Sequence, residues 1–536
     1  MIVSRSQTSE TARQHRSKHR SAPTPESAAS RRVSSEKNYD LVVVGTGTAG
    51  IHTILGALKG HGPSPLKIAS IDPSTMAGGV AYGEPSSISS LTVSTLDEFL
   101  PADELRGFVE WLSEDFDLLA IATKARSFAS HEVFRAWVRR NRQALDAGNW
   151  GPLQVPRRWY GEYLEAQLVE AQKTTKHHYS RLQGVVTSLE PCASDGGYRI
   201  GTSNDMVLRC ANVVLASGTH RPASAIEAEG DLGRLIENPY APSMDRTLDS
   251  IAALSTSDNR VPHVGLIGAN ASALELVYHI AHAEALDVEV TLINGDGLPA
   301  FHPNGPDVDG WPSPALESLA VQETVTSAQV VEAVLADMVR AEGNSLTTSQ
   351  AIRSTRSGMH TALQRLSSDE LLQFANFDGP SVMRRQRRFG PEMRLANDHL
   401  FEQERMHLAT GRVTHLSGSK NGTTVTWDNS DNHTTDQHFD LVINCSGTRI
   451  GNSTRPKNLL DHLTENDVIS RTLSGRGILV DESLQAAPNL YYIGPMLAGN
   501  VLAGKAVWHL EHCGRLIGLS KTLAQTLSDS FVAATA

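Results

Sequence analysis

Short apolar runs of strand length alternate with helix-like stretches over most of the chain. Residues 40–44 and 263–267 are two such runs, and each breaks at a glycine and continues into a helical pattern, over 51–58 and 274–283. An apolar strand, a glycine turn and a helix in this order predict the opening unit of a parallel α/β sheet. Because the pattern occurs twice, the sequence predicts two α/β domains of the same kind.

The first glycine turn has the spacing of a dinucleotide-binding loop, Gly45-x-Gly47-x-x-Gly50. The first glycine makes a turn that other residues resist, the second lets the backbone approach a pyrophosphate, and the third lets helix pack on strand. Asp72 ends the next strand about 20 residues on, where an acid binds a ribose 2′-hydroxyl. We therefore predict a Rossmann-like domain in which these four residues bind the cofactor; an empty α/β domain with a glycine turn is the alternative.

The second turn departs from this spacing, because Asn270 replaces the middle glycine. The following strand, residues 288–293, ends in Asn294 instead of an acid, and loss of that acid removes a repulsion against a 2′-phosphate. The second turn therefore favours NADPH over NADH; a turn that binds no nucleotide is the alternative. The residues predicted to contact the second nucleotide are Gly268, Asn270, Ser272 and Ala273.

Each unit also closes in the same way, on an apolar strand that ends in a small residue, serine and glycine. Residues 211–218 end at Gly218, and residues 439–447 end at Gly447. The two units have similar lengths from opening to closing glycine, which is a coarse internal symmetry and not a short repeat. Gly218 is predicted to lie at the first cofactor.

These turns and closing strands resemble those of flavoproteins with two dinucleotide-binding domains, in which the nicotinamide domain is inserted into the FAD domain. Residues 79–82 (Gly-Val-Ala-Tyr), 155–164 and 489–495 extend the likeness, which covers residues 38–515. The chain is similar to the broad FAD/NAD(P)-binding family that sits beside the class B, N-hydroxylating flavin monooxygenases. The resemblance implies bound FAD, a transient NADPH or NADH, and a place near the flavin ring for Gly494 and residues 496–504.

The resemblance and the pattern together suggest a division of the chain. The predicted parts are a disordered tail at 1–37, the first part of the FAD domain at 38–220, the nicotinamide domain at 260–450 with a helical excursion at about 311–415, a return to the FAD domain at 451–515, and a terminal helix and tail at 516–536. The excursion is longer than a nucleotide fold needs, so we expect it to build a helical subdomain over the active site. An arginine- and serine-rich start is also typical of a transit peptide.

Several polar residues are candidates for ligand contacts. Arg157 and Arg158 precede a predicted helix, and we expect one of them, assigned to Arg158, to face flavin phosphate or ribose; a solvated pair is the alternative. The densest charge run, residues 384–388, is interpreted as a solvated face or as a clamp for an acidic substrate or the NADP 2′-phosphate. The residues predicted to approach substrate are Arg384, Arg385, Arg388, Asn500 and Lys505. No catalytic residue is predicted.

Composition excludes some classes of function. The 536 residues carry a formal net charge of -11, which argues against a nucleic-acid surface. No apolar run approaches the roughly 20 residues that cross a bilayer, and few cysteines fit a cytoplasmic protein. The four cysteines are far apart, so neither a metal site nor a redox disulfide is suggested.

Without a cysteine pair, electrons are expected to leave the flavin directly, to oxygen or to a small oxidant. The favoured expectation is an FAD-dependent, NADPH-using monooxygenase that hydroxylates the nitrogen of a small amine or amino acid, with O2 and a small molecule as its partners. Asn270 departs from the N-hydroxylase pattern, which leaves two alternatives open. One is a non-oxygenating FAD oxidoreductase, and the other is a flavin-binding protein with a regulatory role.

Overall fold

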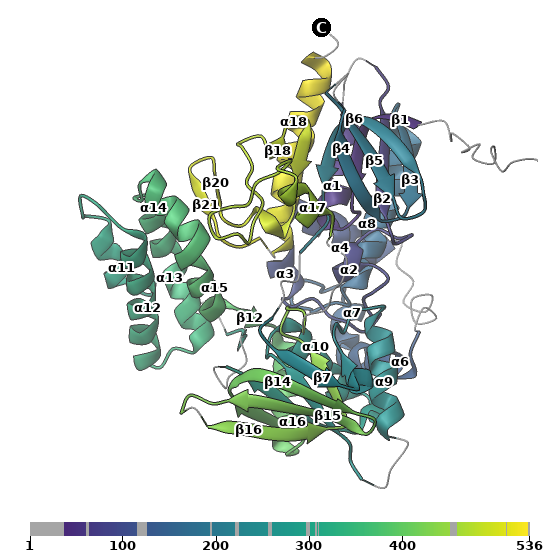
Figure 1. Cartoon of the computed structure of the whole chain (residues 1–536). Helices are drawn as coiled ribbons and strands as arrows, with labels where there is room; N and C mark the ends of the chain where they lie inside the picture. The colour runs from purple at the N-terminus through teal and green to yellow at the C-terminus, as the bar shows by residue number, and fades with distance from the viewer. Residues whose placement is uncertain are drawn as a thin grey trace, which may run out of the picture. The chain divides into compact units, whose positions relative to one another are not determined.

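A mostly parallel sheet forms the first part of the chain, with β1 at its centre (Figure 1). Its strands run in the order β19-β6-β1-β2-β3, and all four pairings are parallel. These strands are β1 (Lys37–Val44), β2 (Lys67–Asp72), β3 (His178–Gln183), β6 (Val207–Leu215) and β19 (Leu490–Tyr492). Antiparallel strands extend the sheet at β19 and β6, namely β18 (Gln485–Ala487), β4 (Val186–Pro191) and β5 (Tyr198–Thr202). The return of the chain at β19, late in the sequence, completes this sheet.

The fold comes from a computed structural model. It describes residues 37–60, 64–114, 126–192, 196–219, 224–255, 260–295, 301–305, 308, 310–431, 433–450, 458–510 and 512–533. The predicted tail at 1–37 lies outside the described residues apart from its last residue, which begins β1.

A second parallel sheet has β9 at its centre, in the order β13-β10-β9-β17-β8. Its strands are β8 (Leu235–Ile236), β9 (His263–Ile267), β10 (Glu289–Asn294), β13 (Met406–Thr410) and β17 (Leu441–Asn444). A smaller sheet has the strand order β16-β15-β14-β7. Strands β14, β15 and β16 lie between β13 and β17 in the sequence, and β7 precedes β8. Its strands are β7 (Glu227–Gly230), β14 (Arg412–Ser419), β15 (Gly422–Asp428) and β16 (Thr434–Phe439).

The two parallel sheets share one topology. In each, the strand before the glycine turn is flanked on one side by the next two strands of the α/β unit and on the other by the closing strand: β3, β2, β1, β6 in the first and β13, β10, β9, β17 in the second. The chain therefore reverses direction across the sheet at the glycine turn, which is the crevice where α/β sheets bind ligands. This arrangement confirms the predicted fold class of two Rossmann-like domains.

Helices cover both sheets (Figure 1). The first-turn helices are α1 (Thr48–Lys59) and α10 (Ala271–His282), and both have mostly buried residues because they are apolar over most of their surface. The others are α2 (Gly79–Tyr82), α3 (Leu96–Phe99), α4 (Ala102–Glu114), α6 (Phe128–Arg140), α7 (Arg142–Asp146), α8 (Arg158–Thr174), α9 (Met244–Ser255), α16 (Pro391–Glu402), α17 (Leu459–Glu465) and α18 (Cys513–Ala533). Asn141 separates α6 from α7.

A group of helices between β10 and α16 forms a separate helical subdomain. It contains α11 (Pro314–Leu319), α12 (Ser327–Gly343), α13 (Thr348–Leu363), α14 (Ser368–Gln373), a π-helical turn (Phe374–Asp378) and α15 (Gly379–Gln386). These helices bury a core of their own, with Val334, Ile352 and Phe374 among its members. The chain enters through β11 (His302–Pro303) and leaves through β12 (Arg388–Phe389), and these two strands pair in parallel as a neck.

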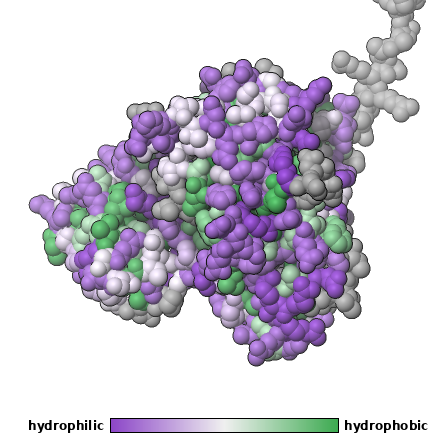
Figure 2. Space-filling view, turned by 90° about the horizontal axis from the view of Figure 1, so that it is seen from below, coloured by the Kyte–Doolittle hydropathy of each residue, from purple (hydrophilic) through white to green (hydrophobic). Residues whose placement is uncertain are grey.

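The face of the molecule in Figure 2 is largely hydrophilic, with hydrophobic residues in small groups. Within the described part of the chain, no helix has both the length and the apolar character to cross a membrane.

Candidate functional site

The first glycine turn is tightly packed at Gly45 and Gly50 and open at Gly47. Gly45 has φ +102°, and a Cβ added there would lie 2.3 Å from the carbonyl oxygen of Ala216 at the end of β6. A Cβ added at Gly50 would lie 2.0 Å from the carbonyl oxygen of Gly45. At Gly47 an added Cβ would meet no described atom within 4 Å. The turn therefore needs Gly45 and Gly50 for its own packing and leaves space at Gly47, where a pyrophosphate is expected to approach.

The start of α1 is suited to a phosphate. Gly47 is its N-cap and has no side chain to cap the first turn, so the N–H groups of that turn are available to an anion. The hydroxyl of Thr48 is buried and has no hydrogen-bond partner among the described residues. These features fit the pyrophosphate of a dinucleotide.

Asp72 lies beside the turn, as its spacing predicts. Its Oδ2 accepts a hydrogen bond from the backbone N–H of Thr46 at 2.7 Å, and its Oδ1 accepts one from the N–H of Ser74 at 2.8 Å. Each carboxylate oxygen keeps a further acceptor site, so the side chain can still receive a ribose hydroxyl. The carboxylate thus holds the turn in shape, and its contact with ribose stays a prediction.

A second pair of glycines presses against the first turn. The N–H of Gly78 donates to the carbonyl oxygen of Thr46 at 2.9 Å. Gly79 has φ +61°, and a Cβ there would lie 3.0 Å from the Cα of Gly47. Helix α2, which begins at Gly79, is thereby fixed directly against the expected pyrophosphate position.

A buried run of hydroxyl residues follows α2, and the sequence analysis missed it. Ser86, Ser87, Ser89, Ser90 and Thr92 are all buried to 2% exposure or less. Within the described chain, the hydroxyls of Ser90 and Thr92 have no hydrogen-bond partner. Buried hydroxyls are normally paired, so this run is a candidate wall for a ligand. The sequence shows only a high density of serine and threonine at residues 86–92, and this density alone does not indicate burial.

Arg157 and Arg158 have different surroundings. Arg157 is mostly buried and points to the second α/β unit, where its guanidinium lies 3.0 Å from Glu275 on α10. Arg158 is 6% exposed, and its Nε and Nη1 have no hydrogen-bond partner among the described residues. Its nearest acid is Glu162, at 3.8 Å. Burial lowers the pKa of Arg158, and Glu162 opposes that shift. Unpaired buried donors fit the predicted role of Arg158 at flavin phosphate or ribose.

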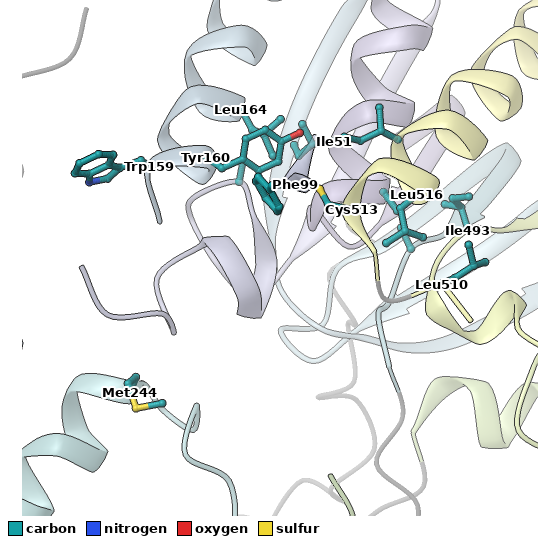
Figure 3. Close-up of a cluster of buried hydrophobic side chains, with 14 of the residues drawn as sticks. Ile51, Phe99, Trp159, Tyr160, Leu164, Met244, Ile493, Leu510, Cys513 and Leu516 are labelled. Atoms are coloured by element: carbon teal, nitrogen blue, oxygen red, sulfur yellow. The ribbon is translucent and has the colours of Figure 1, made fainter. Parts of the chain in front are cut away.

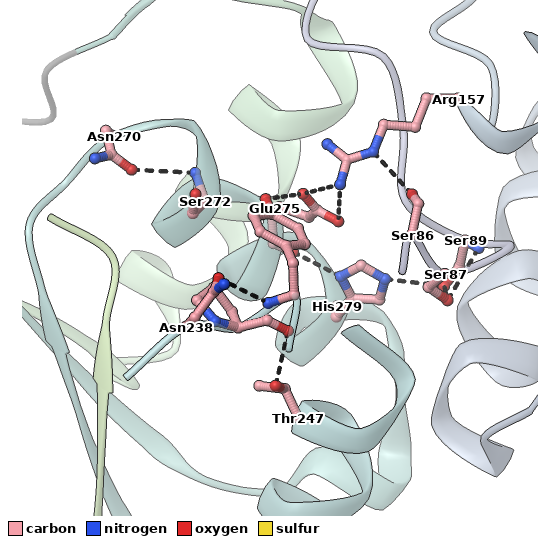
Figure 4. A network of polar contacts seen from close by, with 12 residues as sticks. Ser86, Ser87, Ser89, Arg157, Asn238, Thr247, Asn270, Ser272, Glu275 and His279 are labelled. Carbon is pink, nitrogen blue, oxygen red and sulfur yellow. Dashed lines mark hydrogen bonds and ion pairs between the residues drawn. The ribbon is translucent and has the colours of Figure 1, made fainter. Parts of the chain in front are cut away.

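A polar network joins the two α/β units around Glu275 (Figure 4). Arg157 donates to Ser86 Oγ at 2.9 Å and pairs with Glu275, which also accepts a hydrogen bond from Tyr240 Oη at 2.7 Å. One turn along α10, His279 Nε2 lies 2.9 Å from Ser89 Oγ. The serine run is therefore tied on one side to the second nucleotide unit.

In the second glycine turn, Gly268 has a positive φ and Asn270 caps the helix that follows. Gly268 has φ +95°, and a Cβ there would lie 3.1 Å from the Cα of Ser446 on the closing segment. Asn270 accepts a hydrogen bond from the N–H of Ser272 at 3.2 Å, which caps α10, and donates to the carbonyl oxygen of Cys445. Asn270 thus acts as the side-chain N-cap of α10. Ala273 is fully buried, and Ser272 is partly exposed at the helix start.

An aromatic cluster packs behind the first turn (Figure 3). The ring of Tyr160 lies 5.4 Å from those of Tyr82 and Phe99. Tyr160 Oη lies 2.9 Å from Nε2 of His52 on α1, and burial lowers the pKa of His52 to about 3. Burial also raises the pKa of the Cys513 thiol to about 12. The ring of His52 and the thiol of Cys513 are therefore uncharged at ordinary pH.

The segment after β19 contains the predicted Gly494, which has φ +152° and precedes a short helical turn. Gly218, with φ +76°, accepts a hydrogen bond from Tyr492 Oη at 3.1 Å, so the ends of β6 and β19 lie together. Asn500 was predicted to approach substrate, and this contact stays a prediction. It is buried at 2% exposure, and its amide bonds to backbone groups of Val480, Ile478 and Leu497.

The other predicted substrate residues separate into two groups. Lys505 is exposed in the hairpin of β20 (Asn500–Leu502) and β21 (Lys505–Val507). Arg384 and Arg385 are exposed at the end of α15. Arg388 instead lies in the neck with its side chain 16% exposed, 3.9 Å from Glu98. Arg388 is therefore more buried than Arg384 and Arg385 of the same charge run.

Comparisons with known proteins agree with this geometry. Residues 42–220 match the model of the FAD-NAD(P)-binding family. An uncharacterized protein of Mycobacterium tuberculosis is 26% identical over 517 residues, covering 91% of this chain and 95% of that protein. The ornithine N-hydroxylase of Kutzneria sp. 744, in a complex with reduced FAD, NADP+ and L-ornithine, has a TM-score of 0.50 at 15% identity, covering 93% of this chain and all of that chain. An FAD-bound cadaverine monooxygenase of Erwinia amylovora has a TM-score of 0.50 at 10% identity, covering 93% and 96%.

The fold and the family match define a class: FAD-NAD(P)-binding proteins with two dinucleotide-binding domains. Within this class, residues 42–220 form an FAD-NAD(P)-binding domain, which confirms the predicted cofactors. The fold is shared with N-hydroxylating flavin monooxygenases, which confirms the resemblance drawn from the sequence.

Proposed function

We propose that this protein is an FAD-dependent, NADPH-using monooxygenase that hydroxylates the nitrogen of a small amine or amino acid. The observation that carries the proposal is the presence of two glycine-turn units in one chain, held together by the network around Glu275. Bound FAD would supply the transfer of electrons from NADPH and the activation of oxygen.

The residues of the chain have binding and positioning roles in this proposal. Gly45, Gly47 and Gly50 shape the turn for the flavin pyrophosphate, Asp72 receives the ribose, and Arg158 offers unpaired donors to phosphate or ribose. Gly218 and Gly494 end the strands beside this turn. Gly268, Asn270, Ser272 and Ala273 form the corresponding start of α10 for NADPH.

The buried aromatic cluster and the buried serine run would keep water from the reacting centre. Tyr160 packs edge to face against Tyr82 and Phe99 behind the first turn, and two hydroxyls of the serine run have no hydrogen-bond partner among the described residues. Excluding water from a site favours oxygen transfer to substrate over wasteful side reactions. None of the four cysteines, all of which lie within the described residues, forms a disulfide, and this supports direct transfer of electrons from the flavin to its acceptor.

The choice of an amine as substrate is supported by two solved structures that share the fold, an ornithine N-hydroxylase and a cadaverine monooxygenase. The second candidate is a non-oxygenating FAD oxidoreductase that uses NAD(P)H. Asn270 favours it, because its side chain is committed to Ser272 and Cys445 within the protein, where the N-hydroxylase pattern has a glycine.

The test measures oxygen and NADPH together in the FAD-loaded protein. We expect NADPH oxidation to increase with one amine in a panel, to consume oxygen in equal amount, and to yield a product that is heavier by one oxygen atom in mass spectrometry. NADPH oxidation that continues under strict anaerobiosis with another acceptor would support the second candidate instead. The Gly47→Ala variant, which should lack FAD, is the control for background oxidation.

A further inference from the structure

A π-helical turn, Phe374–Asp378, interrupts the helical subdomain between α14 and α15. Its middle residue, Asn376, is polar and yet fully buried, with 0% exposure. Single π-helical turns between α-helices are uncommon and occur frequently at functional sites. The contacts of Asn376 therefore indicate what this turn does.

The side chain of Asn376 joins two distant segments to its own helix. Its Nδ2 donates to the carbonyl oxygen of Leu372, one turn earlier, at 2.9 Å and to that of Gly499 at 2.8 Å. Its Oδ1 accepts a hydrogen bond from the backbone N–H of Ser474 at 3.0 Å. A side chain of this length satisfies all three backbone groups only if it is an amide, with two N–H donors and an acceptor oxygen. Aspartate has the same shape but cannot donate to the two carbonyl groups.

Gly499 meets this amide in a closely packed turn. It has φ +100°, and a Cβ added there would lie 2.7 Å from Asn376 Oδ1 and 2.6 Å from Thr472 Oγ1. Thr472 Oγ1 accepts a hydrogen bond from the N–H of Gly477 at 3.1 Å. A Cβ added at Gly477 would lie 2.0 Å from the carbonyl oxygen of Ala498. The three segments are therefore packed so closely that a single methyl group would force them apart.

The chain after Gly499 belongs to the helical side of this contact. Ala506, in the hairpin of β20 and β21, is a member of the core of the helical subdomain, and Trp508 packs against that core. The ring of Trp508 meets that of Phe374 in the π-helical turn nearly at right angles, with 5.1 Å between the ring centroids. The hairpin is therefore fixed to the π-helical turn by apolar packing.

The chain before Gly499 lies at the edge of the first parallel sheet. The N–H of Ile493 donates to the carbonyl oxygen of Leu215, the last residue of β6, at 2.9 Å. Strands β6 and β19 run parallel to β1, so the carboxyl ends of all three lie at one edge, and α/β sheets bind their ligands at that edge. Leu497 is fully buried in the core that contains these strands. Residues 494–499 thus connect the crevice at the first glycine turn to the helical subdomain.

We infer that Asn376 is a positioning residue of the FAD site: it fixes residues 494–499 at the cofactor crevice and makes their position depend on the helical subdomain. It does so through the backbone of Gly499. The inference goes beyond the proposed function, because it requires FAD at the first turn and no particular substrate. Protein groups around a flavin tune its electronic properties, so a displaced segment should change the properties of the bound cofactor.

The test compares the FAD-loaded protein with its Asn376→Asp variant, by the visible absorption spectrum of the oxidised flavin and by its reduction potential in equilibrium with a redox dye. Aspartate keeps the size of the side chain and loses both donated hydrogen bonds. We expect the flavin bands and the potential to shift at an unchanged ratio of FAD to protein. The matched control is Asn344→Asp, which removes an exposed amide that donates to the carbonyl oxygen of Arg340 in the same subdomain. The control should keep the parental spectrum and potential.

A second variant, Gly499→Ala, disturbs the same contact from the other side, because its Cβ would press on Asn376 Oδ1. We expect it to shift the spectrum and the potential as Asn376→Asp does, and the double variant to add little to either change. It also decides the question if Asn376→Asp does not fold.

Parental spectra and potentials in the two variants, or equal shifts in Asn344→Asp, would overturn the inference. A purely structural role predicts a lower melting temperature with no change in the bound flavin. Because neither measurement involves NADPH, oxygen or an amine, failure of the proposed reaction would leave the result intact.

Discussion

The guanidinium of Arg157 and the carboxylate of Glu275 lie 3.0 Å apart, and both side chains are buried, with 12% and 2% exposure. Arg157 precedes α8 in the FAD part of the chain, and Glu275 lies on the first-turn helix of the second α/β unit. Tyr240 packs on the guanidinium at 5.2 Å and donates to the same carboxylate. The two nucleotide units are therefore held together by a buried charge pair as well as by apolar packing.

Replacing one partner of this pair should be strongly destabilising. Glu275→Gln leaves the Arg157 charge buried without its partner, so we expect the free energy of unfolding to fall by about 3 kcal/mol. Urea unfolding of the FAD-loaded protein measures the change. Glu284→Gln, an exposed acid just beyond α10, is the control and should stay within about 0.5 kcal/mol of the parent. A similar stability for both variants would show that the pair contributes little.

The glycines of the first turn should differ in what their loss does. Gly47→Ala meets no described atom within 4 Å, so the apoprotein should keep its stability to within about 1 kcal/mol. FAD content should nevertheless fall, because the methyl group occupies the space expected for the pyrophosphate. Gly50→Ala places its Cβ 2.0 Å from a backbone oxygen and should destabilise the fold itself. The ratio of flavin to protein absorbance and a thermal melt separate the two effects.

Arg158→Met should separate cofactor binding from stability. The substitution removes a buried guanidinium whose Nε and Nη1 have no hydrogen-bond partner in the described part of the chain, so the apoprotein should be as stable as the parent or more stable. FAD affinity should fall about tenfold or more, since a charge-assisted hydrogen bond to phosphate contributes about 1.5–3 kcal/mol. Fluorescence titration of the apoprotein with FAD measures this. Unchanged affinity, equal to that of the exposed Arg139→Met control, would remove Arg158 from the cofactor site.

Acid should destabilise the protein through His52. Burial lowers its folded-state pKa to about 3, whereas an unfolded histidine titrates near 6.5. The unfolded state therefore binds more protons between these values, and stability is lost as the pH falls through that window. Between pH 7.5 and 5 the parent should lose about 2 kcal/mol more than His52→Gln, in which the titrating ring is absent. Equal losses in paired urea titrations would contradict the buried, neutral assignment.

The second turn can be tested by kinetics. Replacing Asn270 and Ser272 together with alanine removes the cap of α10 and the hydroxyl at its start. We expect the Michaelis constant for NADPH to rise several-fold while FAD content stays at the parental level. A constant that does not change would indicate that this turn holds no nucleotide.

The parts of the fold that the sequence predicted are those that local patterns determine. The apolar strands before Gly45 and Gly268 must be buried in a sheet, and the turn glycines are needed for positive φ or close approach, so the strand–turn–helix units follow from short segments. The position of Asp72 follows from the fixed length of the α/β unit, and it lies beside the turn. The family match confirms the FAD- and NAD(P)-binding character of this part.

The parts that escaped prediction depend on contacts between distant residues. Arg353 and Glu98 are 255 positions apart in the sequence, and no local pattern relates them. Asn500 resembled a ligand residue because it follows a Gly-Pro turn, but only the fold shows that its amide serves three backbone groups. Arg157 and Arg158 are adjacent and identical, and their different roles follow from the direction in which the start of α8 turns each side chain.

The neck formed by β11 and β12 holds the two ends of the helical subdomain together. His302 pairs beside Arg388, so the two ends of the helical subdomain lie next to each other. The strands β10 and β13 pair directly, and α16 packs on α10, without help from the inserted helices. The helical subdomain can therefore change in length or sequence while both parallel sheets keep the same strand order and strand pairing. Changes within the helical subdomain would therefore leave the pairing of β9, β10 and β13 unchanged.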